Sequence, residues 1–176
     1  MEKWLDRAFN ACGTIAAIFL VGICVWVLAQ IIGRLLGVAI PSADEFAGYC
    51  LSASTFLALS YALRQGSHIR VTLLIDRLPP KGRRWFETVC VAGGLALSAY
   101  LTWFTIEMVW FSIEFGDLTQ GLVPIPLWIP QMGMVIGLTM LTLAFAVDAS
   151  RILKGLNPVY LPIGATVAER DSASER

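Results

Sequence analysis

Long stretches of apolar residues alternate with shorter polar segments along this 176-residue chain. The first stretch, residues 11–33, contains no charged residue, and three more apolar stretches follow it. An α-helix rises ~1.5 Å per residue and the hydrocarbon core of a bilayer is ~30 Å thick, so about 20 apolar residues span it. The pattern therefore predicts four transmembrane helices, at about residues 11–33, 46–63, 86–110 and 127–148.

The predicted fold class is an all-α membrane protein. An open sheet would leave backbone groups unpaired in lipid, and a closed barrel would show short alternating segments instead. We expect residues 1–154 to form a single four-helix membrane domain, followed by a polar tail over residues 155–176. The first apolar stretch is too long for the core of a signal peptide and lacks a convincing cleavage site, so we expect it to be retained.

A basic segment, residues 64–84, links the second and third stretches and contains the only histidine, His68. Its apolar residues recur at helical spacing, which predicts a short amphipathic helix in the headgroup layer over residues 68–79. The alternation over residues 69–73 would also suit a strand, but the sequence offers no partner strand. Pro80 can open the next helix.

The basic residues are distributed asymmetrically although the formal net charge is zero. Twelve of the 13 Lys and Arg residues lie on one side of the predicted helices, and Arg34 alone lies on the other. By the positive-inside rule, we expect both termini of this multi-pass membrane protein to be cytoplasmic. The outward surface carries three tryptophans and five acidic residues, Asp44, Glu45, Glu107, Glu114 and Asp117.

The cysteine and histidine content argues against several chemistries. The four cysteines, Cys12, Cys24, Cys50 and Cys90, show no CxxC spacing and are interpreted as small buried residues. A single histidine cannot ligate a haem from both faces, and the chain has no phosphate-binding loop or nucleophile elbow. We therefore expect no enzymatic activity, no metal or cofactor of its own, and no nucleic-acid partner.

Small residues indicate where helices can pack closely. Gly133 and Gly137 form a GxxxG motif in the fourth predicted helix, which lets helix backbones approach each other where lipid gives no hydrophobic drive. The same spacing recurs at Gly48 with Ser52 and at Gly94 with Ser98.

Two further predictions concern the outward side. Ser42 and Glu45 have the spacing of a capping box, which would place negative charge at the positive end of the second helix. Arg34 is expected to pair with Glu107, or with Asp44 or Glu45. The alternative is that Arg34 extends to a lipid phosphate, because charged groups near the bilayer either pair or reach the headgroups.

The run from Asp44 and Glu45 through LALSYALRQGSHIRVTLLIDRLPPKGRR, followed later by PLWIPQ at residues 126–131, resembles the small integral-membrane subunit of tripartite ATP-independent periplasmic (TRAP) transporters. The resemblance covers residues 4–154 and is strongest over residues 64–79, with the HIRV core. One departure is that Pro-Ser-Ala precedes the acidic pair where many relatives carry a tryptophan.

The resemblance implies a division of labour among three proteins. A periplasmic protein captures the substrate, a small organic acid anion, and a large membrane subunit with the sodium sites moves it by an elevator-type mechanism. This chain would be the static scaffold, in contact with both proteins and with membrane lipids. The positions matching the family that would hold the scaffold or contact lipid are Glu45, Arg64, His68, Ile69, Arg70, Arg77, Pro126, Trp128, Pro130 and Gln131.

Two alternatives belong to other classes of protein. A small four-helix exporter working as a homo-oligomer would need an intramembrane acidic residue for proton coupling, and Glu107 is the candidate, near the end of its helix. An accessory subunit of an unrelated membrane complex is the other. Neither predicts the HIRV segment.

Overall fold

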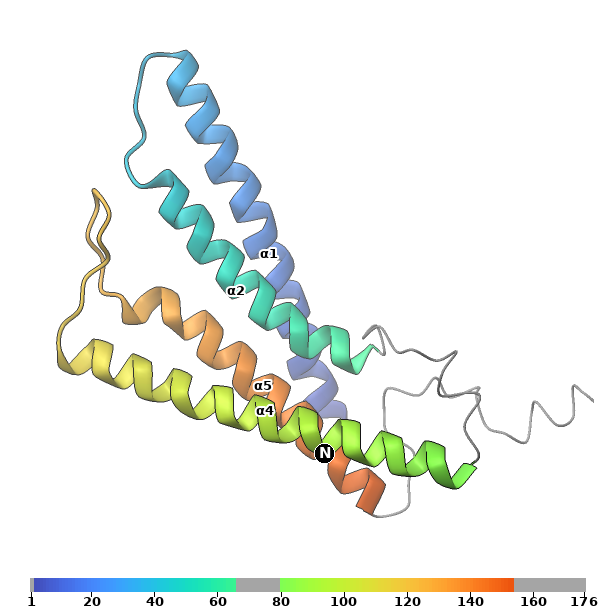
Figure 1. Cartoon of the computed structure of the whole chain (residues 1–176). Helices are drawn as coiled ribbons and strands as arrows, with labels where there is room; N and C mark the ends of the chain where they lie inside the picture. Colours follow the sequence, from blue (N-terminus) through green and yellow to red (C-terminus); the bar gives the residue numbers. More distant parts are fainter. Residues whose placement is uncertain (1, 66–79, 154–176) are drawn as a thin grey trace, which may run out of the picture.

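The computed structural model of the chain describes residues 2–65 and 80–153. These residues form four α-helices, α1 (Glu2–Leu35), α2 (Ala43–Arg64), α4 (Pro80–Glu114) and α5 (Trp128–Leu153) (Figure 1). Each helix contains a stretch that is long and apolar enough to cross a membrane. The predicted class, an all-α protein with four membrane spans, is confirmed.

The helices are longer than the apolar stretches that predicted them. α1 begins at Glu2 instead of residue 11, and α4 begins at Pro80 instead of residue 86. The apolar pattern marks only the part of a helix that lies in hydrocarbon, whereas the backbone hydrogen bonds continue into the polar flanks. The predicted amphipathic helix at residues 68–79, with His68, Ile69, Arg70 and Arg77, and the polar tail at 155–176 lie outside the described residues.

The helices lie in a row in the order α1, α2, α5, α4, because the main contacts are α1 with α2, α2 with α5 and α5 with α4. The first residues of α1 and α4 lie at the same side of the molecule as the last residues of α2 and α5, and we call this side the terminal end. The other end, with the connections 36–42 and 115–127, is the loop end. Figure 1 shows the α1–α2 pair and the α4–α5 pair close together toward the terminal end and spread apart at the loop end.

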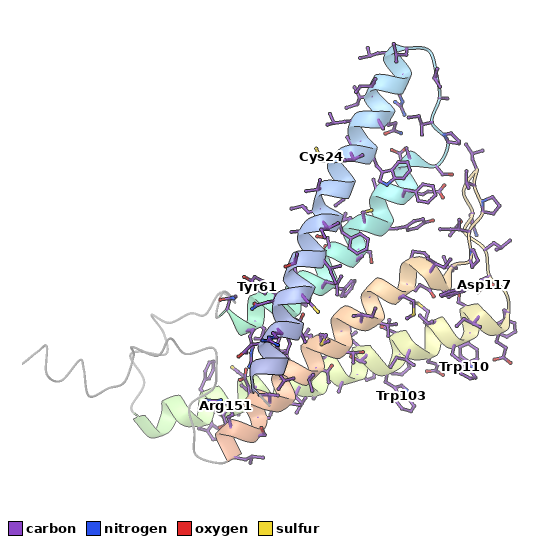
Figure 2. The ribbon with its side chains drawn as sticks, turned by 180° about the vertical axis from the view of Figure 1, so that it is seen from behind. Cys24, Tyr61, Trp103, Trp110, Asp117 and Arg151 are labelled. Carbon is purple, nitrogen blue, oxygen red and sulfur yellow. The ribbon has the colours of Figure 1, made fainter. Side chains whose placement is uncertain are left out.

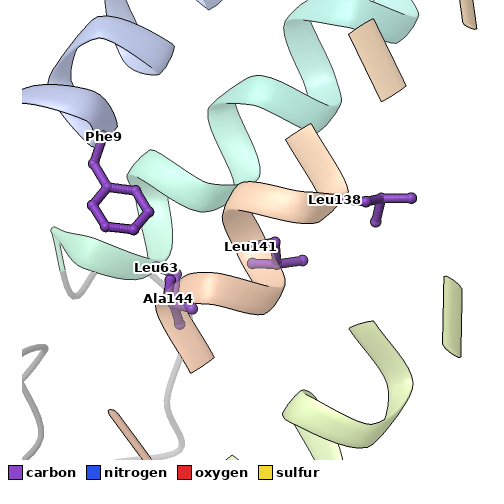
Figure 3. Packing of buried hydrophobic residues seen from close by; sticks show 5 residues of the cluster. All are labelled: Phe9, Leu63, Leu138, Leu141 and Ala144. Carbon is purple, nitrogen blue, oxygen red and sulfur yellow. The ribbon is translucent and has the colours of Figure 1, made fainter. Parts of the chain in front are cut away.

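The hydrophobic core lies toward the terminal end, where three helices meet. It contains Phe9 from α1, Leu63 from α2, and Leu138, Leu141 and Ala144 from α5, all buried (Figure 3). In a bilayer this packing is not driven by transfer from water, because lipid tails are as apolar as leucine. Close van der Waals contact and interhelical hydrogen bonds hold the helices together instead.

Small residues bring α2 and α5 into close contact. A Cβ added to Gly133 would lie 2.7 Å from the Cβ of Ala53, and one added to Gly137 would lie 2.7 Å from the Cβ of Phe56. The structure therefore places both glycines of the GxxxG motif at the contact between α2 and α5. Of the other small-residue pairs, Gly94 lies against the ring of Phe145, whereas Gly48 faces open space.

Hydrogen bonds of buried or half-buried hydroxyl groups join the other neighbouring helices. The Ser54 hydroxyl on α2 donates to the backbone oxygen of Ala16 on α1, at 2.9 Å. Thr102 on α4 and Thr142 on α5 share a hydrogen bond of 2.9 Å between their hydroxyls. Each such bond contributes about 0.6 kcal/mol on average in a membrane protein, so the helices keep their places through several modest contacts.

We expect Gly137→Ala to lower the stability of the detergent-solubilised protein by about 1–3 kcal/mol, because the added methyl group would overlap the backbone of Phe56. The matched control is Gly48→Ala, since Gly48 lies on a membrane-spanning helix but has nothing within 4 Å of an added Cβ. Thermal unfolding followed by circular dichroism measures both. Equal melting temperatures for the two variants would contradict a tight α2–α5 contact.

Candidate functional site

The described residues hold no group of three or more His, Cys, Asp or Glu side chains that could bind a metal ion. All four cysteines are free: Cys12 is buried and Cys50 half-buried, but Cys24 and Cys90 are exposed. The interpretation of all four as buried residues was therefore wrong for two of them, because these two lie on helix faces that none of the other three described helices covers. The candidate functional surfaces of the described residues are therefore the two ends of the helix row and the exposed faces of its helices.

At the terminal end, Arg64 joins α2 to α1. Its Nη2 and Nε atoms donate to the same oxygen of Asp6, at 2.7 Å and 3.2 Å, and its guanidinium carbon lies 5.0 Å from the centre of the Phe9 ring. The Arg64 side chain is only 10% exposed, whereas that of Asp6 is 53% exposed. Arg64, which the family resemblance assigned to lipid or to the large subunit, thus makes a contact within the chain.

Sequence reasoning missed Asp6 and Asp148. Asp148 is 3% exposed in the last part of α5, at the same end of the molecule. Asp6 precedes the first uncharged stretch, and Asp148 is the last residue of the fourth predicted helix, so a search for uncharged stretches passes over both. For Asp6 a signal was present: Asp6 and Arg64 carry opposite charges at matching ends of two helices joined by a short loop.

At the loop end, Ser42 connects α2 to the distant 115–127 loop. Its backbone is left-handed, with φ 58°, and its hydroxyl accepts a hydrogen bond from the Val123 backbone N–H at 3.1 Å. The Ser42 side chain makes no capping bond to α2, so the predicted capping box is wrong. The backbone oxygen of Ser42 instead accepts from the N–H groups of Glu45 and Phe46, both at 3.1 Å.

Glu45 has its carboxylate against the same loop. The carboxylate lies where a Cβ on Gly121 would stand, so a side chain at position 121 would collide with it. The Tyr49 hydroxyl donates to Oε2 of Glu45 at 3.4 Å. Through Ser42 and Glu45, the start of α2 therefore holds the tip of the loop that joins α4 to α5.

The 115–127 loop folds back on itself as a small hairpin. Thr119 N–H donates to the Ile125 backbone oxygen at 2.9 Å, and Ile125 N–H donates to the Thr119 hydroxyl at 3.0 Å. Leu118 and Pro126 form an antiparallel bridge at its base. The PLWIPQ segment thus closes the hairpin with Pro126 and starts α5 at Trp128.

The rest of that segment forms the first turn of α5. Trp128 is 39% exposed and Pro130 is half-buried. Gln131 is half-buried as well, and its Oε1 atom is buried without a hydrogen-bond partner among the described residues. The segment therefore has a structural position in this chain, at the joint between the hairpin and the helix.

Arg34 and Glu107 are not brought together. Both side chains are exposed, and neither forms an ion pair with another residue in the described ranges. Arg34 is the last basic residue of α1, next to the 36–42 connection, while Glu107 lies on α4. Since α1 and α4 are the two outer helices of the row, the expected pairing with Glu107 is not found within this chain, nor is the pairing with Asp44 or Glu45.

We expect Arg64→Ala to destabilise the protein in detergent by about 1–3 kcal/mol, because the substitution removes a charge-assisted hydrogen bond and the contact with the Phe9 ring. Asp6→Ala should have an effect of similar size, since it leaves a largely buried guanidinium without its anion. Asp117→Ala, which removes an exposed carboxylate at the loop end, is the control. If Arg64→Ala melts at the same temperature as the control, the contact contributes nothing.

Comparison with known proteins identifies the chain's relatives. The sequence model of the family described as tripartite ATP-independent periplasmic transporters, DctQ component, matches residues 23–155. The ectoine TRAP transporter small permease protein TeaB of Halomonas elongata is 26% identical over 153 residues, which are 84% of this chain and 76% of that protein.

A longer relative contains a region like this chain as one part. The isethionate TRAP transporter permease protein DctMQ of Oleidesulfovibrio alaskensis is 26% identical over 160 residues, which are 87% of this chain but only 24% of that protein. The four-span fold and the family match agree. The chain belongs to the DctQ component family of the tripartite ATP-independent periplasmic transporters, a family of transporter components rather than of enzymes.

Proposed function

We propose that this chain is the small membrane subunit of a sodium-driven, binding-protein-dependent TRAP transporter and serves as a static scaffold for a large membrane subunit of the elevator type. The observation that carries this proposal is the family match over residues 23–155, which includes three of the four helices in full. The longer DctMQ relative supports a partner that is a larger membrane protein, because a chain of this kind makes up 24% of it.

The helices themselves suit a scaffold better than a substrate path. Substrate and ion sites in transporters are usually formed by discontinuous helices whose unwound backbone coordinates the ligand. All four described helices are continuous through their membrane spans. Several hydroxyl groups between these helices bond to neighbouring backbone or to each other, as Ser54 does with Ala16 and Thr102 with Thr142, and so serve packing.

The substrate is proposed to be a small organic acid anion, selected by the other two proteins. The two relatives are equally similar to this chain, at 26% identity, yet one is named for isethionate and the other for ectoine. The identity to these relatives therefore does not favour either compound for this chain. Sodium ions are also assigned to the large subunit, because the continuous helices described in this chain offer no unwound backbone to coordinate them.

The protein is proposed to lie in a bacterial inner membrane with its terminal end in the cytoplasm. Arg7, Arg64 and Arg151 lie at the terminal end, whereas Arg34 is the basic residue of the described loop end. The loop end would then face the periplasm, where its hairpin and acidic residues could meet the binding protein. His68, Ile69, Arg70 and Arg77 are proposed to contact lipid or the large subunit on the cytoplasmic side.

The orientation can be tested with single cysteines in a cysteine-free variant. We expect Gln120→Cys, at the hairpin, to react with a membrane-impermeant maleimide in intact cells, and Gln65→Cys, at the end of α2, to react only after the cells are opened. Both glutamines are exposed in the structure, so a difference in labelling between the two cysteines reports the side of the membrane on which each lies. The reverse labelling pattern would show that the terminal end faces outward.

The transport role can be tested in reconstituted vesicles. We expect uptake to require this chain, the large membrane subunit, the binding protein and an inward sodium gradient, and to proceed without ATP. Omitting this chain should reduce the uptake rate to the level of empty vesicles, because the large subunit would lose its fixed support. Full uptake by the large subunit and the binding protein alone would refute an obligatory role.

A further inference from the structure

The two outer helices of the row present different free faces. On α1 the most exposed side chains of the membrane span are aliphatic, among them Ile18, Val21, Val25, Leu28 and Ile32. On α4 the free face carries what we call the aromatic edge, formed by Tyr100, Trp103, Phe104, Glu107, Trp110 and Phe111, all exposed. Aliphatic side chains suit lipid tails, whereas aromatic side chains are enriched at the cores of protein interfaces.

The aromatic edge lies opposite the contact with α5. The buried residues of α4, such as Ser98, Thr105, Val109 and Ser112, follow each other at helical spacing on the side that packs on α5. The members of the aromatic edge fall between them, on the other side of the helix. Figure 2 shows Trp103 and Trp110 on the side of α4 that points away from α5.

Membrane depth distinguishes this edge from an ordinary belt of interfacial aromatics. Tryptophan and tyrosine gather at the two membrane–water interfaces, where the ring can sit among headgroups. The span of α4 runs from Thr88 to Glu114, and Tyr100 stands 12 residues after its start and 14 before its end. Tyr100, which is 60% exposed, and Trp103, which is 71% exposed, therefore lie near the middle of the bilayer, where a headgroup belt does not explain them.

Glu107 gives the edge a charge that lipid cannot satisfy. It lies seven residues before Glu114, or roughly 10 Å along the helix axis, inside the span. An acidic residue in a transmembrane segment almost always faces a protein interior or a partner, because exposure to hydrocarbon is costly. Glutamate also lacks the long side chain by which lysine or arginine reaches the headgroups. Glu107 has no ion pair among the described residues, so its partner is expected on another chain.

We propose that the aromatic edge of α4 is the surface that docks on the large membrane subunit, and that an arginine or lysine of that subunit pairs with Glu107. This inference rests on the proposed function, which supplies the large subunit as the partner. A second copy of this chain fits the edge poorly. A two-fold dimer of membrane proteins with the same orientation would place Glu107 opposite Glu107 of the copy, and like charges at an interface repel each other.

The docking face can be mapped by photocrosslinking in membranes that contain this chain and the large subunit. The photoreactive amino acid p-benzoylphenylalanine replaces Trp103 or Trp110 on α4, and in the matched control it replaces Leu28, which is 50% exposed on the aliphatic face of α1. We expect adducts with the large subunit from both α4 positions and none from Leu28.

The ion pair is tested by co-purification of the large subunit with the tagged chain in mild detergent. Glu107→Ala should lower recovery about tenfold or more, because it leaves the partner's charge buried and unpaired, and Glu107→Gln should lie in between. Glu114→Gln is the control, since Glu114 ends the same helix and is exposed. Because Glu107 is exposed in this chain, none of these substitutions disturbs its core.

The outcomes separate this inference from the proposed function. If the unaltered chain retains the large subunit but adducts form only from Leu28, or not at all, the α4 face is overturned while the proposed function stands. Adducts of twice the chain's mass from Trp103 would assign the edge to a second copy and overturn the inference. Unchanged recovery with Glu107→Ala would overturn the ion pair. If the unaltered chain never retains the large subunit, the proposed function fails together with the inference.

Discussion

The arrangement of this molecule depends on the close approach of α2 and α5. These two helices form the middle of the row, and their contact is the main one between the α1–α2 pair and the α4–α5 pair. Gly133 and Gly137 make it possible, because Ala53 and Phe56 occupy the space that larger side chains would need. In lipid, where apolar burial gives no advantage over exposure to the tails, such close packing is a principal source of helix association.

A second constraint acts at the ends, where the chain meets water and headgroups. At the terminal end, Arg64 ties α2 to α1 through Asp6 and Phe9. At the loop end, where the helix pairs spread apart, the Ser42 hydroxyl and the Glu45 carboxylate hold the hairpin of the 115–127 loop. The Arg64 contact fixes α1 on α2, whereas the loop-end contacts and the α2–α5 contact hold the α1–α2 pair against the α4–α5 pair. Rigidity of that kind suits a scaffold.

The sequence was sufficient for the features that follow from apolar length and small-residue spacing. It predicted four spans, and it singled out the glycines that the structure places between α2 and α5. It was not sufficient where one side chain had a choice of partners. Ser42 has the residue type of an N-cap, but its left-handed backbone turns its hydroxyl to Val123, 81 residues away. Arg64 was assigned to lipid or to the large subunit from the family resemblance, because apolar stretches and motifs do not single out Asp6 as its partner.

The two free faces that remain after this packing differ in the surroundings that suit them. A row of four helices has two outer helices, and each leaves one face that the described residues of the chain do not cover. The aliphatic face of α1 needs no partner, because hydrocarbon satisfies it fully. The face of α4 carries the Glu107 carboxylate and the Tyr100 hydroxyl within the span. Another protein can offer these polar groups hydrogen bonds or an ion pair, which lipid tails cannot. A subunit built in this way would be held to its transporter along one edge and would widen the transporter's base in the membrane with the other three helices.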